Sequence, residues 1–470
     1  MLSYMLFKNT IIRYSYKMTK LTFHGGAQSV TGANYLLESG EAKILVDCGL
    51  AQGSKLAEDQ NFADFPYNPA EIDALLITHA HIDHTGRIPH LYKKGFRGHV
   101  YSTPPTKDFA EQLLIDSEDI LRREAKEAGR EPLYDIRDVR EILKRWRTVN
   151  YHQPARLGDF AAEFFDAGHI LGSAFISVTT PEGKRVTFSG DLGNMPNPLL
   201  KDIEPIGKAN YVLVESTYGG RTHEPAQERT KLFAQVITQT AKNKAVLMIP
   251  AFAMERTQQL LFELNELVEQ KHIPRIPVYI DSPLAIKITA IYKKYAQDAE
   301  YFDAKAIAQI RNGDAIFDFP GLHLTLTSRQ SKEINDAPPP KIIIAGSGMS
   351  QGGRILHHEK RYLQDPNSTI LFVGYQAKGS LGRQILEGAK EISIFDEQVP
   401  VRCNVQAIGG YSAHADQPKL IEWLQTAQDK PETIFVVQGE EEQATALAAK
   451  IKTDLVVKAL VPLPDQTVTL

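Results

Sequence analysis

Three histidines and one aspartate fall within the six consecutive positions His79-Ala80-His81-Ile82-Asp83-His84. The residues directly before this run are mostly apolar and predict a short buried strand, so the histidines stand where a strand ends in a loop. In an extended stretch, residues two apart point the same way, which lets His79 and His81 bind one metal ion while Asp83 and His84 turn toward a second. The run therefore predicts two metal sites built from one loop.

Two further polar residues interrupt apolar surroundings in the first half of the chain. His169 stands between glycines in a predicted loop, where core packing does not require an imidazole. Asp191 follows an apolar strand pattern, as Asp47 does earlier in the chain. A carboxylate at such a strand end can bridge two cations, so Asp191 and three histidines would complete one site.

Length and composition limit the fold and the class of protein. A chain of 470 residues exceeds what one hydrophobic core usually supports, so we expect two domains. No segment approaches ~20 uninterrupted apolar residues, which predicts no membrane span. The formal net charge of -4 argues against bulk electrostatic capture of nucleic acid, although it leaves room for a local basic groove. The cysteines, Cys48 and Cys403, form no disulfide framework and favour a reducing cytoplasm.

The pattern of predicted strands and helices changes along the chain. Residues 1–20 lack the apolar core and cleavage site of a signal peptide, so we interpret them as an N-terminal extension, or as a start codon assigned upstream of Met18. Short strand patterns then predominate to about residue 210, with helical patterns over 107–128 and 135–146. Strands alternate with helices over 211–397, which predicts a second domain of α/β type with a parallel sheet.

The order and spacing of the polar residues resemble the metallo-β-lactamase fold, a four-layer αββα sandwich of the α/β class with a two-metal site at the edge of its sheets. The second half resembles the β-CASP branch, whose nucleases carry an α/β domain inserted into that fold, and most of all its RNA-processing members. The segments that carry this resemblance are 214–219, 249–258, 281–285, 346–354, 374–383 and 410–416. It implies a first sandwich part over 21–207, a β-CASP domain over 208–398 and a C-terminal sandwich part over 399–470.

The resemblance also implies roles for the polar residues. One zinc ion would be held by His79, His81 and His169, and the other by Asp83 and His84. Asp191 would bridge the two ions, while Asp47 would orient a ligand histidine. Two zinc ions would lower the pKa of a shared water and direct the hydroxide at a phosphodiester of single-stranded RNA.

Catalysis also needs a proton for the leaving 3′ oxygen. His414 is the expected general acid, and Glu215 is its expected partner, because a carboxylate favours the charged imidazolium and orients it. The expected catalytic residues are therefore Asp83, Glu215 and His414, and the implied products carry 5′-phosphate and 3′-hydroxyl ends.

Gln438 departs from the RNA-processing branch, which usually has a histidine at this position before Gly-Glu. A carboxamide offers only a neutral oxygen, which is a weaker zinc ligand than imidazole and suits harder ions better. We therefore expect a second site that is weak, that uses manganese, or that fills only with substrate present. The DNA-acting branch is commonly apolar here, so the chain matches neither branch at this position.

A glycine-rich turn over 347–353 follows a predicted strand, and its free amide groups can cradle a phosphate. Guanidinium groups beside such turns are candidate clamps, because they meet phosphate through two parallel hydrogen bonds. The expected phosphate-binding residues are Ser347, Gly348, Met349, Ser412, Arg256, Arg354 and Arg383.

Three functions remain open from the sequence. The favoured one is a two-metal ribonuclease acting on single-stranded RNA in the cleft between the domains. The second is an RNA-binding relative with a weakened second metal site and slight activity, against which the intact 79–84 run, Asp191 and His414 argue. The third is a DNA nuclease or a small-ester hydrolase. Dimerisation is frequent among relatives, so a homodimer is a further expectation, while the sequence does not distinguish internal cleavage from cleavage at an end.

Overall fold

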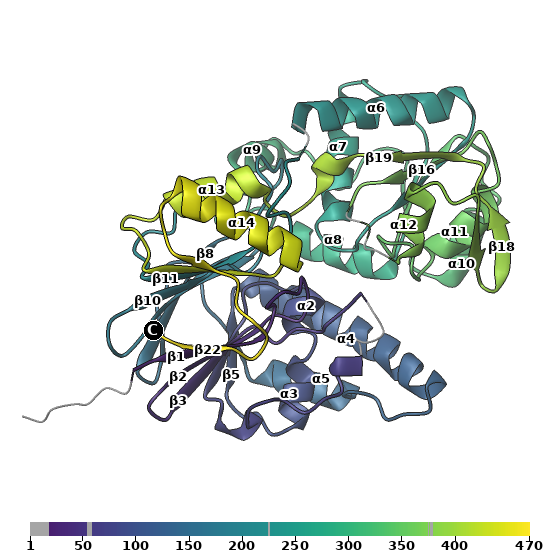
Figure 1. Cartoon of the computed structure of the whole chain (residues 1–470). Coiled ribbons are helices and arrows are strands. Elements are labelled where there is room, and N and C mark those ends of the chain that lie inside the picture. Colours follow the sequence, from purple (N-terminus) through teal and green to yellow (C-terminus); the bar gives the residue numbers. More distant parts are fainter. Residues whose placement is uncertain (1–17, 54–58, 224–225, 375, 377–378) are drawn as a thin grey trace, which may run out of the picture.

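The computed structural model describes residues 18–53, 59–223, 226–374, 376 and 379–470. These residues form two lobes (Figure 1): a sandwich lobe, made of two sheets with their helices, and an insert lobe built on a third sheet. Strand β1 (Lys20–Gly25) begins where the folded part was expected to start. The rest of the expected N-terminal extension, residues 1–17, lies outside the described residues.

The first sheet has the strand order β22-β1-β2-β3-β4-β5-β6. Its strands pair antiparallel from β22 to β3 and parallel from β3 to β6. The strands are β1, β2 (Asn34–Ser39), β3 (Ala42–Val46), β4 (Ala74–Leu76), β5 (His99–Ser102), β6 (Trp146–Thr148) and β22 (Thr467–Thr469). The helical segments between them are η1 (Pro69–Glu71), α2 (Ile82–Thr85), α3 (Ile88–Lys93), α4 (Pro104–Glu127) and α5 (Ile136–Lys144).

The second sheet has the strand order β21-β20-β11-β10-β9-β8-β7. Phe23 of β1 lies 5.2 Å from Phe435 of β20 between ring centroids, and Tyr35 of β2 lies 6.0 Å from Phe188 of β10, so the two sheets pack face to face. The strands are β7 (Ala155–Leu157), β8 (Phe160–Asp166), β9 (Ala174–Thr179), β10 (Arg185–Phe188), β11 (Tyr211–Glu215), β20 (Thr433–Val437) and β21 (Ala459–Leu460).

Helices α13 (Gln417–Gln425) and α14 (Glu441–Asp454) cover the other face of the second sheet. Strand residues Val212 and Val436 share a buried cluster there with Trp423 of α13 and Leu447 of α14. With the helices beside the first sheet, this gives the αββα order of layers, and the predicted metallo-β-lactamase sandwich with an inserted α/β domain is confirmed.

The third sheet has the order β14-β13-β15-β12-β16-β19, and its strands pair parallel. Its central strands are buried along their whole length, as expected for a parallel sheet covered by helices on both faces. The strands are β12 (Val246–Pro250), β13 (Val278–Asp281), β14 (Leu322–Leu324), β15 (Lys341–Ala345), β16 (Thr369–Phe372) and β19 (Asn404–Ala407). Around them lie α6 (Ala226–Lys242), α7 (Arg256–Glu269), α8 (Pro283–Tyr295), α9 (Ala304–Arg311), α10 (Ser328–Glu333), α11 (Ile355–Tyr362), α12 (Leu381–Leu386) and the hairpin of β17 (Glu391–Ile394) and β18 (Glu397–Pro400).

One helix ends earlier than expected from the sequence. The helical pattern over 135–146 ends as helix α5 at Lys144, because Trp146 pairs in β6 and its buried indole donates to Ser102 Oγ at 2.8 Å. Strand β19 pairs with β16 of the third sheet, and the domain boundary expected at residue 398 stays a prediction.

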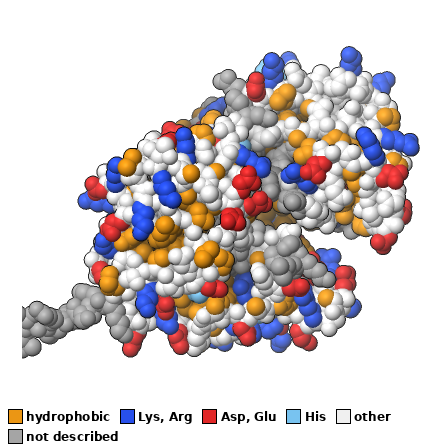
Figure 2. All heavy atoms as spheres, viewed as in Figure 1, with side chains coloured by type: hydrophobic (Ala, Val, Ile, Leu, Met, Phe, Trp, Pro, Cys, Tyr) orange, Lys and Arg blue, Asp and Glu red, His pale blue; other side chains and the backbone are white. Residues whose placement is uncertain are grey.

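The lobes contact each other through α4 and α8, where Lys294 and Tyr295 donate to Asp108 at 2.6 and 2.8 Å. The carboxyl edge of the third sheet faces the sandwich, because the chain runs from the end of β19 through the short helix η2 (Gly409–Tyr411) to His414, which forms a β-bridge with Gly193 of the sandwich lobe. Figure 2 shows the surface hollowed between the lobes. Among the described residues, no helix has both the length and the apolar character needed to cross a membrane.

Candidate active site

The run 79–84 begins as an extended loop after β4 and ends in a helical turn. His81 is the last residue before α2, so Asp83 and His84 lie on a turn of helix rather than on an extended loop. Backbone N–H groups of Ala33 and Cys48 donate to the carbonyls of Asp83 and His84 at 3.0 and 2.8 Å. The close approach needs a glycine at position 49, where a Cβ would lie 1.5 Å from the carbonyl oxygen of Asp83.

A first cluster brings together His79, His81, His169 and Asp191 from three different loops, with their ligand atoms all within 4.8 Å of one another. His79 Nε2 lies 3.0 Å from His81 Nδ1 and 3.3 Å from Asp191 Oδ2. His169 Nε2 lies 3.4 Å from the same carboxylate oxygen. Three nitrogens and one oxygen in a buried site are a donor set typical of zinc.

Hydrogen bonds and burial prepare these rings for metal binding. His169 Nδ1 donates to the carbonyl of Ala413 at 3.1 Å, which leaves Nε2 facing the cluster. Burial lowers the pKa of His81 and of His169 well below the usual value, and the neighbouring His79 lowers that of His81 further. Neutral imidazole is the form that binds a metal ion, so the cluster suits a cation.

A second cluster lies on the other side of Asp191. His84 Nε2 is 3.4 Å from Asp191 Oδ1 and 3.8 Å from Asp83 Oδ2. Burial lowers the pKa of His84, but the carboxylates of Asp191, Asp47 and Asp83 outweigh burial and raise it well above the usual value. This excess of negative charge is what a second cation would neutralise.

Gln438 enters this second cluster from the end of β20. Its Nε2 donates to Asp191 Oδ1 at 2.8 Å and lies 3.0 Å from His84 Nε2, while Tyr35 donates to its Oε1 at 3.4 Å. The side chain is 1% exposed. The residues of the first site thus fit a metal ion, whereas the second site has the amide nitrogen of Gln438 close to two of its ligand atoms, Asp191 Oδ1 and His84 Nε2.

Asp47 contacts His84 on the face away from the cluster. Its Oδ2 is 2.7 Å from His84 Nδ1, so Nε2 of the ring points at Asp191, and this geometry suits the predicted orienting role. Thr78 holds the carboxylate from both sides: its backbone N–H donates to Oδ1 at 2.9 Å and its hydroxyl to Oδ2 at 2.8 Å. The sequence reasoning missed Thr78, although its place directly before His79 is a signal that could have found it.

His414 and Glu215 lie next to the first cluster. His414 Nδ1 is 3.1 Å from Glu215 Oε2 and 3.8 Å from Asp191 Oδ2. Glu215 is fully buried at the end of β11 and also accepts a hydrogen bond from the backbone N–H of Leu192 at 2.7 Å. Burial lowers the pKa of His414, but Glu215 and Asp191 outweigh burial and raise it to about 9. A raised pKa favours the charged imidazolium, which is the form that can donate a proton.

The expected phosphate-binding arginines do not form a cluster. Arg256 is 5% exposed, contacts Gln259 and lies over the ring of Tyr411 at 5.8 Å. Arg354 donates to Asp281 Oδ1 at 2.8 Å, and Arg383 pairs with Glu387, the residue directly after its helix α12, at 2.7 Å. Each guanidinium has a partner within the protein, and the phosphate contacts of the three arginines stay a prediction.

The glycine-rich turn follows the carboxyl end of β15, and Ser412 follows η2 on the segment that leads to His414. Ser347 Oγ accepts from the backbone N–H of Gln351 at 3.0 Å, the carbonyl of Gly348 accepts from Gln376 at 2.9 Å, and that of Met349 accepts from the N–H of Gly382 at 3.1 Å. Ser412 is buried, and its hydroxyl accepts from the N–H of His414 at 3.3 Å. Their phosphate contacts stay a prediction.

A buried network that the sequence reasoning missed anchors the segment leading to His414. Arg229 donates to Glu263 at 2.7 Å and to the carbonyl of Gly410 at 3.1 Å, and Tyr411 donates to the same carboxylate at 2.6 Å. These residues are scattered on α6, α7 and η2, so no local pattern marks them.

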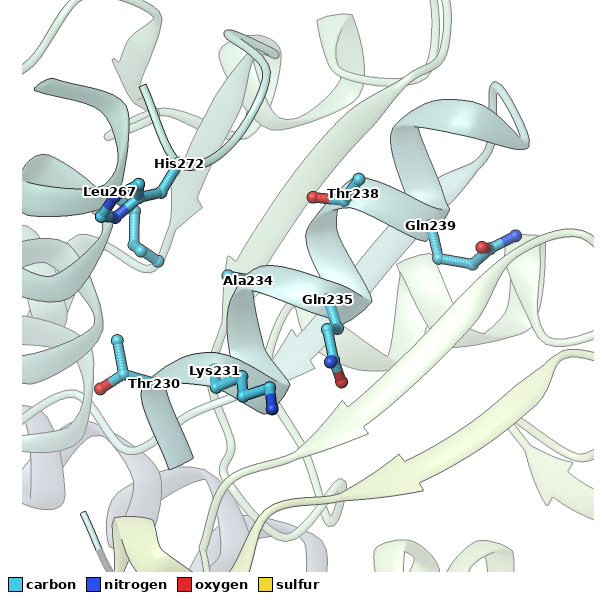
Figure 3. A pocket seen from close by; sticks show the side chains of 8 residues that line it. All are labelled: Thr230, Lys231, Ala234, Gln235, Thr238, Gln239, Leu267 and His272. Atoms are coloured by element: carbon cyan, nitrogen blue, oxygen red, sulfur yellow. The ribbon is translucent and has the colours of Figure 1, made fainter. Parts of the chain in front are cut away.

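A separate cavity of about 680 Å³ lies on the insert lobe between α6 and the end of α7 (Figure 3). It is lined by Lys231, Gln235, Leu267 and His272 among others, and contains none of the residues of the two clusters. It is therefore distinct from the candidate active site.

Comparison with protein families divides the chain into three matched parts. A metallo-beta-lactamase superfamily domain matches residues 36–207, a Beta-Casp domain matches 257–385, and a Zn-dependent metallo-hydrolase RNA specificity domain matches 398–462. These parts follow the order of the lobes in the structure.

Individual relatives cover nearly the whole chain. Ribonuclease TTHA0252 of Thermus thermophilus is 39% identical over 90% of this chain and 94% of its own length. Transcription termination factor FttA of Methanosarcina mazei is 32% identical over 92% of this chain and 68% of its own length. A protein of unknown function from Enterococcus faecalis V583 shares the fold, with a TM-score of 0.54 at 13% identity, over 96% of this chain and 100% of its own. The chain therefore belongs to the β-CASP family of metallo-β-lactamase-fold nucleases, with relatives in its RNA-processing branch.

Proposed function

We propose that this protein is a metal-dependent ribonuclease that hydrolyses phosphodiester bonds of single-stranded RNA in the hollow between the lobes. The observation that carries the proposal is the His414–Glu215 pair beside a buried cluster of three histidines and Asp191. The RNA specificity domain and the relative named as a ribonuclease support RNA over other phosphodiesters.

His79, His81, His169 and Asp191 would hold one zinc ion, and Asp83, His84 and Asp191 would hold a second. Bound ions supply Lewis-acid chemistry and an activated water nucleophile at such a site. Asp191 lies between the two clusters, with Oδ2 toward His79 and Oδ1 toward His84, which supports a bridging role. Asp47 keeps Nε2 of His84 directed inward.

The chain itself supplies the proton. Because Nδ1 of His414 faces Glu215, Nε2 is the atom left to donate to the leaving 3′ oxygen. Glu215 keeps the ring charged and oriented, and its buried hydrogen bond from Leu192 keeps the carboxylate in place. Such a step leaves a 3′-hydroxyl on one product and a 5′-phosphate on the other.

Gln438 supports a second site that binds its ion weakly or prefers manganese. Its amide N–H already donates to Asp191 Oδ1, so the amide must rotate before its oxygen can reach an ion. A carbonyl oxygen suits a harder ion than zinc. Titration of metal-free protein with zinc and with manganese, followed by calorimetry, should give one tight event and one weak event, and two equally tight zinc events would contradict this part of the proposal.

The test of function is an assay on labelled RNA and DNA of the same sequence, with zinc or manganese, beside His81→Ala. Cleavage of RNA by the wild type and not by the variant is expected. Cleavage that persists in the variant would point to contamination or to another site. RNA labelled at either end distinguishes internal cleavage from stepwise cleavage at an end. A preference for the DNA strand would identify DNA rather than RNA as the substrate.

The second candidate function is an RNA-binding relative with slight activity, which the position of the Gln438 amide between His84 and Asp191 favours. Tight RNA binding with negligible cleavage under both metals would support it. The expected homodimer stays a prediction, which analytical ultracentrifugation tests.

A further inference from the structure

We propose that Phe252 is a stacking platform for one base of the RNA strand, an inference that rests on the proposed ribonuclease function. Phe252 is 40% exposed, and among the described residues it and Phe395 are the phenylalanines that stand among the exposed large apolar side chains. Base stacking on an exposed aromatic ring is a common way to bind single-stranded nucleic acid, because every base has a π-face.

Phe252 lies on the edge of the third sheet that faces the metal clusters. It lies two residues after the end of β12, whose carboxyl end is aligned with those of β15, β16 and β19 in the parallel sheet. The same edge continues from β19 to His414, and Glu255 of the Phe252 loop accepts from Asn197 of the sandwich lobe at 2.9 Å. Ligands of open α/β sheets bind beyond the carboxyl ends of the strands.

Two glycines pack closely against one edge of the ring. A Cβ at Gly348 would lie 2.7 Å from Cδ2 of Phe252, and one at Gly374 would lie 3.6 Å from Cε2. Gln376 ties these two glycine segments together, since its Nε2 donates to the carbonyls of Gly348 and Gly374 at 2.9 and 3.2 Å. Because these two contacting residues lack side chains, the ring is 40% exposed although its edge is packed.

The backbone beneath the ring is also held. Thr257 donates to the carbonyl of Phe252 at 2.7 Å, and Gln258 donates to that of Ala253 at 3.1 Å. A platform that is ordered before the strand arrives costs little conformational entropy on binding. Gly348 belongs to the turn expected to cradle a phosphate, so a phosphate and an adjacent base would be held side by side.

Phe395 is a matched control. It is 49% exposed, but it lies on the β17–β18 hairpin, which Figure 1 shows at the outer end of the insert lobe, and its ring is 4.7 Å from that of His357. Its exposure is similar, and its position is away from the edge that leads to His414.

The experiment measures binding of fluorescein-labelled single-stranded RNA by anisotropy, in a zinc-loaded His414→Ala background that slows cleavage. Phe252→Ala should weaken binding roughly tenfold, the effect expected from losing one stacked base. Phe252→Tyr should bind like the parent, Phe252→Leu should lose most of the effect of the ring, and Phe395→Ala should leave affinity unchanged. Thermal melts check that each variant is folded.

A second measurement tests stacking directly with oligonucleotides that carry one abasic residue. One abasic position should weaken binding to the parent but not to Phe252→Ala. Equal affinity of the parent, Phe252→Ala and Phe395→Ala would overturn the platform, and so would an abasic effect that is the same with and without the ring. If the wild type cleaves RNA while Phe252→Ala binds RNA normally, the stacking role of Phe252 is refuted and the ribonuclease function stands. If the wild type neither binds nor cleaves RNA, both the ribonuclease function and the stacking role are refuted.

Discussion

The His414→Ala variant separates proton donation from every other role of this residue. The variant removes an imidazole whose Nδ1 lies 3.1 Å from the fully buried Glu215. A positioned general acid contributes roughly 10²–10⁴ in rate, which corresponds to about 3–5 kcal/mol of transition-state free energy. We therefore expect the rate of RNA cleavage to fall by that factor.

The assay compares RNA with a p-nitrophenyl phosphodiester, whose leaving group departs as an anion and needs no proton. Hydrolysis of this ester should fall less than roughly tenfold in His414→Ala, because only the proton donor is lost. Glu215→Gln should lower RNA cleavage by a smaller factor, since an amide oxygen still accepts from Nδ1 while the charge that favours imidazolium is lost.

The metal content of the His414→Ala variant shows whether His414 acts as a general acid or as a metal ligand. His414, Glu215 and Asp191 have ligand atoms within 4.8 Å of one another, so this group could itself hold a cation. Elemental analysis should give the same metal content for His414→Ala and wild type. Equal losses on RNA and on the activated ester, or loss of an ion with the imidazole, would refute the role as general acid.

Three further perturbations test the structure. Gln438→His should tighten binding of the second zinc ion, because an imidazole replaces the amide that now lies 3.0 Å from His84 Nε2, and unchanged calorimetry would contradict this. Asp47→Asn should lower metal affinity roughly 10–100-fold, as measured by chelator competition, because the carboxylate that orients the His84 ring is lost. An unchanged affinity would show that the residue at position 47, held by Thr78, still orients His84 without the carboxylate charge. Glu359 is buried, which raises its pKa to about 8 although Ser350 donates to it. Below the pKa that the Glu359 carboxyl has in the unfolded chain, this carboxyl is protonated in both the folded and the unfolded state. As the pH rises, the unfolded state releases the proton first, so the free energy of unfolding falls until the pH passes about 8. Glu359→Gln should therefore be more stable than wild type in urea at pH 8 and equal to it at pH 4.5, and a constant difference across pH would oppose this assignment.

Local sequence patterns predicted most of the elements that position the site. The apolar run before His79 forms β4, and the run 341–345 forms β15 (Lys341–Ala345). A short apolar stretch bounded by turns usually forms a buried strand, which is why the local pattern predicted both. The pattern over 135–146 was less informative at its end. Trp146 fits an amphipathic helix equally well, and only its pairing beside β5 assigns it to a strand.

Side-chain identity in the sequence determined the chemistry available to this protein: imidazoles and carboxylates at strand ends, and an amide at position 438. Only the tertiary structure decided which of these groups meet, because Gln438 and His84 are 354 positions apart and come together through the pairing of β20 beside β11. It also turned Arg256 inward, where its guanidinium lies over Tyr411, and left Phe252 exposed between two glycines. Burial and contact distance depend on the packing of distant segments, and no local pattern carries that information.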